Sequence, residues 1–142
     1  MKLVLPLCIL ILLVSCKESK KTEEDLTQME QVMTIHDEVM PKMRKLARLV
    51  AEIKPKVDST AAGKDYKVAM TDLQEANKSM MNWMMVFGER FNSDEILEGK
   101  ELSPQKQKWL DEEEIKVIAL KKQINSSIEK AEVLLDLSLI HI

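Results

Sequence analysis

Apolar residues recur at alternating intervals of three and four along three long segments, and this repeat constrains the fold more than any other feature. In the first segment the repeat is Leu26, Met29, Met33, His36, Met40, Met43, Ala47 and Val50. A second stripe beside it holds Val32, Ile35, Val39, Leu46, Leu49 and Ile53. Such intervals place side chains on one face of an α-helix. Together the stripes are wider than a two-stranded coiled-coil seam, so this helix is expected to contact two neighbours.

The first helix is predicted to begin after Thr22, which can cap it, with Glu23, Glu24 and Asp25 favoured near the positive end of the helix dipole. Pro41 removes one helical hydrogen bond, but the apolar repeat continues through it. A kink is therefore expected at Pro41 rather than a break.

A second helix is predicted from about Lys64 to Phe91. Its stripe is Tyr66, Met70, Leu73, Asn77, Met80, Met84, Phe87 and Phe91. Asn77 is polar, and it is consistent either with a register-fixing core residue or with a plain edge position. Gly88 is expected inside the end of this helix. Gly63 and Gly99 are expected in the two connections, over 55–63 and 92–103.

Ser103 and Pro104 predict the start of a third helix, because serine caps helices and proline is tolerated at the first helical position. Its stripe is Leu110, Val117, Leu120, Ile124, Ser127, Ala131 and Leu134. The three segments predict an all-α fold, an antiparallel up-down-up three-helix bundle over 23–136. A fourth element beyond a truncated C-terminus is left open.

The N-terminus predicts a secretory signal over residues 1–15. Lys2 precedes an apolar run that is too short to span a bilayer. The run ends in Leu13-Val14-Ser15-Cys16, which resembles the lipobox of bacterial lipoproteins. The resemblance implies cleavage before Cys16, acylation of that cysteine and a tether over 16–22. It also implies durable anchoring, because such lipoproteins usually carry several acyl chains, and one chain binds a membrane only marginally.

The cell envelope is the predicted location. Residue 17 is Lys rather than the Asp that often retains lipoproteins in an inner membrane, so the outer membrane is favoured. Cys16-Lys17-Glu18 resembles the export signal of surface lipoproteins in Bacteroidota, but Ser19 interrupts the acidic run. The periplasmic and surface faces of the membrane both stay open.

Residues 137–142 read Leu-Ser-Leu-Ile-His-Ile, which matches the translation of a transposase end sequence used in sequencing libraries. We interpret this hexapeptide as a sequencing-adapter artefact. Native sequence is then expected to stop near Asp136, and His141 carries no functional argument. The alternative is a genuine apolar tail.

Charge and motifs narrow the function. The net charge is −3, and loss of Lys2 with the signal makes the mature chain more acidic, which argues against a nucleic-acid partner. Glycine-rich phosphate loops and the usual zinc, haem and di-iron motifs are missing from the sequence. The acidic run of residues 111–114 is predicted to be a solvated face favoured by the helix dipole rather than a cation site. The basic patch of Lys42, Arg44, Lys45 and Arg48 is predicted to be solvated or to form intramolecular salt bridges. No enzyme activity is predicted, and no cofactor beyond the lipid on Cys16.

Methionine is the unusual component, with ten in the chain. It fills cores adaptably and also ligates Cu(I). If the first two helices pack antiparallel, His36 falls beside Met84 and Met40 beside Met80, with Trp83 adjacent. The primary interpretation is a methionine-filled core. The alternative is a soft-metal site for Cu(I) or Ag(I) formed by His36, Met40, Met80 and Met84.

Two motifs carry a family resemblance. The segment His36-Asp37-Glu38-Val39-Met40-Pro41-Lys42-Met43 and the later segment Met80-Met81-Asn82-Trp83-Met84 with Phe87 resemble a group of small uncharacterised Bacteroidota lipoproteins. Some of these carry the label "viral A-type inclusion protein", which indicates coiled-coil similarity. The group usually has Asp at the position of Asn82, and it implies no activity. The leading hypothesis is a non-enzymatic, lipid-anchored interaction module that contacts an envelope protein or polymer.

Overall fold

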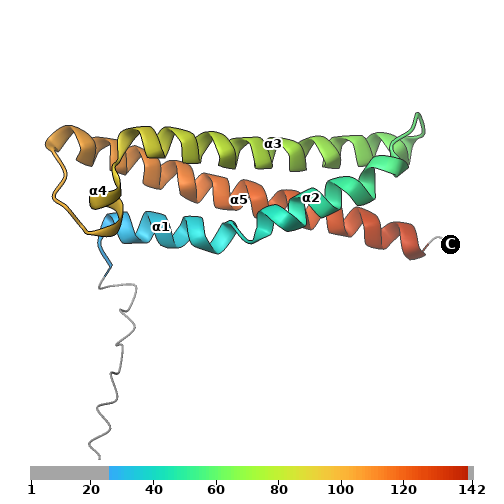
Figure 1. Cartoon of the computed structure of the whole chain (residues 1–142). Coiled ribbons are helices and arrows are strands. Elements are labelled where there is room, and N and C mark those ends of the chain that lie inside the picture. Colours follow the sequence, from blue (N-terminus) through green and yellow to red (C-terminus); the bar gives the residue numbers. More distant parts are fainter. Residues whose placement is uncertain (1–25, 141–142) are drawn as a thin grey trace, which may run out of the picture.

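The computed structural model describes residues 26–140, and these form helices and connections without any β-strand. The elements are α1 (Gln28–Val39), α2 (Lys42–Ile53), a 3₁₀ turn η2 (Lys54–Lys56), α3 (Ala61–Arg90), α4 (Ser93–Leu97) and α5 (Pro104–Ile140). α3 and α5 run antiparallel along the length of the molecule, and α1 with α2 forms the third rod (Figure 1). The predicted all-α antiparallel bundle is therefore confirmed. The predicted signal, Cys16, the tether, Thr22 and His141 lie outside the described residues.

α1 begins later than the sequence predicted. Leu26 and Thr27 are not helical, and Thr27 is the N-cap. The Thr27 hydroxyl accepts a hydrogen bond from the Glu30 backbone N–H, and the Glu30 carboxylate accepts one from the Thr27 backbone N–H at 2.7 Å. This reciprocal pair is a capping box, which satisfies two otherwise free backbone donors. The predicted start after Thr22 is wrong because the complete capping box lies five residues further on.

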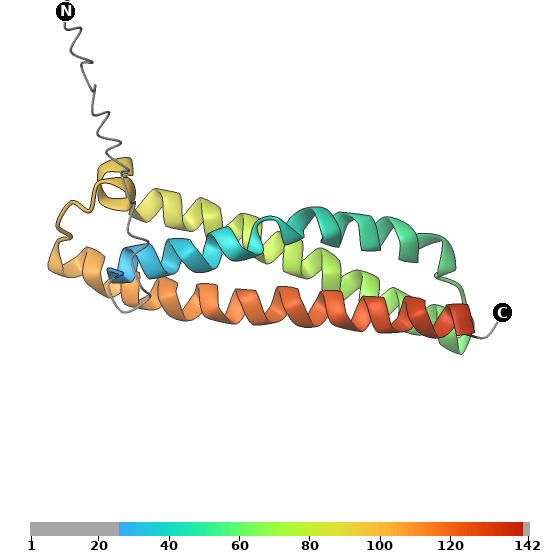
Figure 2. The same cartoon turned by 90° about the horizontal axis from the view of Figure 1, so that it is seen from below.

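The chain bends at Pro41, between α1 and α2 (Figure 2). Met40 and Pro41 keep right-handed helical dihedral angles, at φ −55°, ψ −42° and φ −60°, ψ −25°. The Met40 N–H still donates to the His36 carbonyl at 2.9 Å, but Pro41 has no N–H to donate to the Asp37 carbonyl, and the Met43 N–H donates to the Met40 carbonyl three residues back. The buried stripe nevertheless continues from Val39 to Leu46. The predicted kink is present, and the helical hydrogen-bond ladder is interrupted there as well.

Gly63 belongs to the first turn of α3 and not to the connection, which corrects the prediction. Thr60 caps α3 by accepting a hydrogen bond from the Gly63 N–H at 3.0 Å, and Asp58 in turn accepts one from the Thr60 N–H at 2.9 Å. A Cβ on Gly63 would lie 1.9 Å from Asp58 Oδ1. The backbone N of Asp58 would lie 2.6 Å from the same Cβ, so the close approach of Asp58 requires glycine at this position. Gly88 lies inside the end of α3 and Gly99 in the second connection, as predicted.

The core uses a different register from the predicted main stripe in α1 and α2. The fully buried residues of this rod come mostly from the second stripe: Val32, Val39, Leu46, Leu49 and Ile53, joined by Met29. Met33, His36, Met40 and Met43 are half-buried at its flank, and Ala47 is exposed. Branched aliphatic side chains thus fill the interior, while most of the methionines cover its edge.

α3 and α5 supply the rest of the core. In α3 the buried positions include Ala69, Ala76 and Trp83, whereas the predicted Met70 and Met84 are half-buried and Asn77 is exposed. Asn77 is therefore an edge residue. In α5 the predicted stripe is buried except for half-buried Leu134, with Ile128 in addition.

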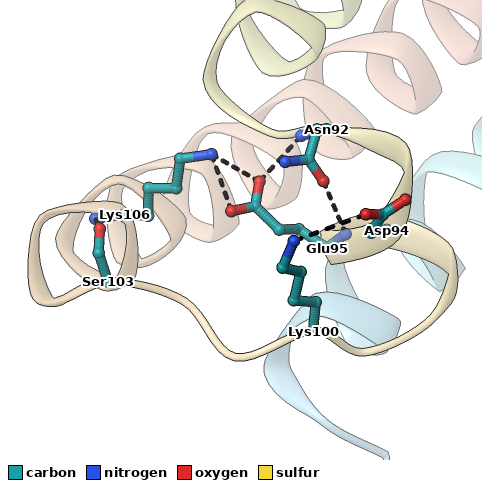
Figure 3. A network of polar contacts seen from close by, with 6 residues as sticks. All are labelled: Asn92, Asp94, Glu95, Lys100, Ser103 and Lys106. Carbon is teal, nitrogen blue, oxygen red and sulfur yellow. Dashed lines mark hydrogen bonds and ion pairs between the residues drawn. The ribbon is translucent and has the colours of Figure 1, made fainter.

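The second connection contains the short helix α4, which the sequence analysis missed. Asn92 caps it, and the Glu95 carboxylate folds back to accept from the Asn92 N–H at 2.9 Å (Figure 3). Lys106 Nζ, on α5, donates to both Glu95 carboxylate oxygens at 2.8 and 2.6 Å. These bonds, from Lys106 first and then from Asn92, lower the pKa of Glu95. Glu95 therefore fastens α4 to α5, and its contribution to stability is lost as pH falls through its depressed pKa.

Candidate functional site

The four residues predicted as a soft-metal site differ in burial. Met80 is fully buried in the core, while Met40 and Met84 are half-buried and pack against that core. The His36 side chain is 15% exposed, and its Nδ1 lies 2.9 Å from Asp37 Oδ1. The Asp37 carboxylate is thus the hydrogen-bond partner of the His36 imidazole. No cluster of three or more His, Cys, Asp or Glu side chains suited to a metal occurs within residues 26–140. The soft-metal site stays a prediction.

His36 instead begins a row of stacked rings. Its imidazole stacks on Trp83 at 5.7 Å between centroids, and Trp83 stacks on Phe87 at 4.8 Å. Phe87 contacts Phe91 at 4.9 Å. Trp83 and Phe87 are four residues apart, which aligns them along one side of α3, and Phe91 is the C-cap residue that follows the helix. The row fixes the Trp83 ring between α1 and the end of α3.

Glu113 contradicts the prediction that the acidic run is a solvated face. Its side chain is 0% exposed, although Asp111 and Glu112 beside it are exposed. Two cations compensate its charge, because Arg90 Nη1 and Lys116 Nζ donate to Glu113 Oε1 at 2.8 and 2.9 Å. A buried carboxylate persists only when it is paired in this way. Glu113 is therefore a buried ionic group at the contact between α3 and α5.

Arg90 ties this ionic group to its surroundings. The same Nη1 atom also donates to Glu112 Oε2 at 2.7 Å, and the guanidinium lies 5.4 Å from the centre of the Trp109 ring. Two carboxylates and two cations thus meet at this point, namely Glu112, Glu113, Arg90 and Lys116. The cluster as a whole is neutral.

A hollow of about 360 Å³ opens between α3 and α5 beside this cluster. α3 contributes Ser79, Asn82, Trp83 and Val86, and α5 contributes Glu113, Lys116, Ala119, Leu120 and Gln123. Two buried polar atoms of its lining residues, Trp83 Nε1 and Glu113 Oε2, have no hydrogen-bond partner within the described part of the chain. Leaving such an atom unsatisfied costs roughly 1–3 kcal/mol, so each calls for an explanation.

The two atoms differ in their hydrogen-bonding character. The indole N–H is a donor only, and an ionised carboxylate oxygen is an acceptor only. Ser79, Asn82 and Gln123 add neutral polar groups, while Val86 and Leu120 add apolar surface.

The sequence contained a signal for both residues. Glu113 fills the gap between Leu110 and Val117 with intervals of three and four, so it falls on the predicted stripe of α5. Trp83 lies three residues after Met80 and four before Phe87, one position from the predicted Met84. The prediction of a fully solvated acidic run overlooks Glu113. The placement of Met84 on the stripe of the second helix overlooks its neighbour Trp83.

The basic patch on α2 behaves as predicted, since Arg44 is exposed and the other three residues form ion pairs. Lys45 pairs with Glu132 at 2.7 Å, Arg48 with Glu52 at 3.4 Å and Lys42 with Glu38 at 3.8 Å. Surface pairs of this kind each contribute about 0–1 kcal/mol. The patch is therefore a set of intramolecular ion pairs beside α5 rather than a free basic surface.

None of the helices over residues 26–140 combines the length and apolar character needed to cross a bilayer. Comparison of the chain with protein-family models, with curated proteins and with solved structures found no match.

Proposed function

We propose that this chain is a lipid-anchored, non-enzymatic binding module of the bacterial cell envelope. The observation that carries the proposal is the hollow of about 360 Å³ between α3 and α5, which is lined by both polar and apolar side chains. A concave site that combines apolar surface with a few polar groups is typical of ligand-binding positions.

The anchoring part of the proposal draws on the N-terminal sequence. The lipobox-like Leu13-Val14-Ser15-Cys16 supports acylation at Cys16, and Lys17 supports placement at the outer membrane. α1 begins near the α4 end of the bundle (Figure 1). A tether from Cys16 would therefore attach at that end, and the ionic cluster of Glu113 lies toward the same end of α5.

A photo-crosslinking amino acid placed at Asn82 tests the proposal in intact cells. Asn82 lines the hollow and is exposed, and the adjacent Met81, which is 56% exposed and does not line the hollow, is the matched control. We expect a discrete crosslinked species from position 82 that is not formed from position 81 and that Glu113→Gln abolishes. Identical products from both positions, or none from either, would reject the binding function.

A further inference from the structure

We propose that the outer face of α5 is a dimer interface, on which a second copy of this chain packs antiparallel about a two-fold axis. The inference is independent of the hollow between α3 and α5, because it uses other residues of α5. Its basis is a row of four exposed side chains, termed the outer row: Asp111, Ile115, Ile118 and Lys122.

The outer row is self-complementary when two copies meet antiparallel. Its intervals are four, three and four residues, which places all four side chains on one side of the helix. An acid stands at one end, a base at the other, and two isoleucines lie between them. With an axis between positions 116 and 117, each Asp111 opposes a Lys122 and each Ile115 opposes an Ile118. A two-fold interface needs such a patch, because whatever residue contacts its counterpart on one side must do so again on the other.

The two isoleucines supply the apolar part of the interface. Ile115 is 71% exposed and Ile118 is 51% exposed, although both are large apolar side chains. Exposed apolar side chains that adjoin one another mark interaction sites more often than scattered ones do. A groove of about 570 Å³ between α1 and α5 lies beside them, and Ile35 and Ile118 contribute to its lining. Ile115 of the second copy would lie against Ile118 at this groove.

The two charges of the outer row have no opposite charge inside the fold. Asp111 Oδ1 accepts hydrogen bonds from the neutral amides of Gln28 at 3.0 Å and Gln107 at 3.4 Å. Across residues 26–140, neither Asp111 nor Lys122 forms an ion pair. Both charges are therefore available to a second copy, and the two-fold axis brings them together twice.

The arrangement is compatible with the proposed anchoring of both copies in one membrane. α1 begins beside the outer row, since Gln28 is its first residue and contacts Asp111. Asp111 and Lys122 are separated by about 17 Å along the helix. The N-terminal ends of the two bundles would therefore be offset by about 17 Å rather than by the full length of α5. An interface this small is expected to be weak in solution, and confinement to a membrane would raise the effective concentration of the chains.

Sedimentation equilibrium of the mature chain with Cys16→Ser tests for the dimer. We expect a reversible monomer–dimer equilibrium with a dissociation constant below about 1 mM. Ile115→Glu should raise this constant at least tenfold, because each substitution enters the interface twice. Val68→Glu is the matched control, since Val68 is 61% exposed on α3, and it should leave the constant unchanged.

Charge reversal tests the pairing of Asp111 with Lys122. Asp111→Lys should raise the dissociation constant about threefold or more, since it places like charges opposite each other. The double variant Asp111→Lys, Lys122→Asp should restore the constant of the parent, because it exchanges the two charges. Lys67→Glu, at an exposed position of α3, is the control for a change of net charge.

Cysteine crosslinking tests the antiparallel register. One chain would carry Asp111→Cys and another Lys122→Cys, each with Cys16→Ser and its own tag, and a short bifunctional thiol reagent would join them. We expect the mixed 111–122 product to exceed the 111–111 and 122–122 products, because equal positions are offset by about 17 Å.

A chain that stays monomeric at about 1 mM would overturn the inference, and so would a dimer that Ile115→Glu leaves unchanged. Predominant crosslinking between equal positions would show a parallel pair and would also reject it. A monomeric chain that still gives the crosslink from Asn82 would retain the proposed binding function and reject only the dimer.

Discussion

Replacing Arg90 and replacing its partner Glu113 should change the free energy of unfolding by very different amounts. Arg90→Met removes one of the two donors of a carboxylate that is 0% exposed and leaves Lys116 as its sole cation. Losing a hydrogen bond to a charged group costs about 1.5–3 kcal/mol. Losing the contact with the Trp109 ring adds about 0.5–1 kcal/mol. We therefore expect Arg90→Met to lower the free energy of unfolding by about 3 kcal/mol.

Glu113→Leu should cost far less. It removes the buried charge and the unsatisfied Oε2 together, while Arg90 keeps Glu112 at 2.7 Å and Lys116 is already 48% exposed. Replacing buried ionic groups by apolar residues is often neutral or stabilising. We expect a free energy of unfolding within about 1 kcal/mol of the parent or higher than it.

Urea denaturation followed by circular dichroism at 222 nm measures both values, provided that the dependence on urea concentration stays constant between variants. Glu112→Gln, which breaks only the half-exposed pair with Arg90, is the control and should change stability by no more than about 1 kcal/mol. If Glu113→Leu proved as damaging as Arg90→Met, the carboxylate itself would be needed for folding. The reasoning that assigns it to binding would then be refuted.

Three further predictions concern the anchor, the bend and the metal. Cys16→Ala should leave the precursor uncleaved and abolish incorporation of labelled fatty acid, and normal cleavage with membrane retention would contradict the lipobox interpretation. Pro41→Ala should raise the midpoint of thermal unfolding by about 4 °C, since helical dihedral angles already exist there, whereas a lower midpoint would show that packing needs the bend. The mature chain should bind Cu(I) no more tightly than its His36→Ala, Met84→Leu variant, and a tight stoichiometric complex lost in that variant would establish the soft-metal site.

The three rods of the bundle were predictable because the apolar repeat is long and regular in each. Ser103 and Pro104 even located the start of α5, where the Lys106 N–H donates to Ser103 Oγ at 3.3 Å. The choice between adjacent positions on a stripe was harder. Ala76 is buried and its neighbour Asn77 exposed, yet the spacing fits both. The neighbouring helices determine how a helix is rotated about its own axis. The periodicity of one segment does not specify that rotation.

The candidate site was less predictable because it depends on pairing between distant segments. Besides the nearby Lys116, the buried Glu113 pairs with Arg90, which is 23 residues earlier in the chain and reaches it across the contact of α3 and α5. α4 escaped notice for a related reason. Its five residues are too few for a periodic pattern, and the Lys106 contact that fastens Glu95 comes from the next helix. The local sequence shows which residues are able to form such pairs, but the packing of distant segments determines which pairs form.

Hydrogen exchange of the Trp83 indole N–H tests most directly the claim that its partner comes from outside the chain. The Nε1 proton can be followed by ¹H–¹⁵N NMR and compared with the backbone N–H of the same residue, which lies in the last third of α3 and is bonded within the helix. Our account predicts that the indole proton exchanges much faster than the backbone proton. An indole proton that exchanged as slowly as the backbone proton would show that Trp83 Nε1 is satisfied inside the fold and would contradict the account.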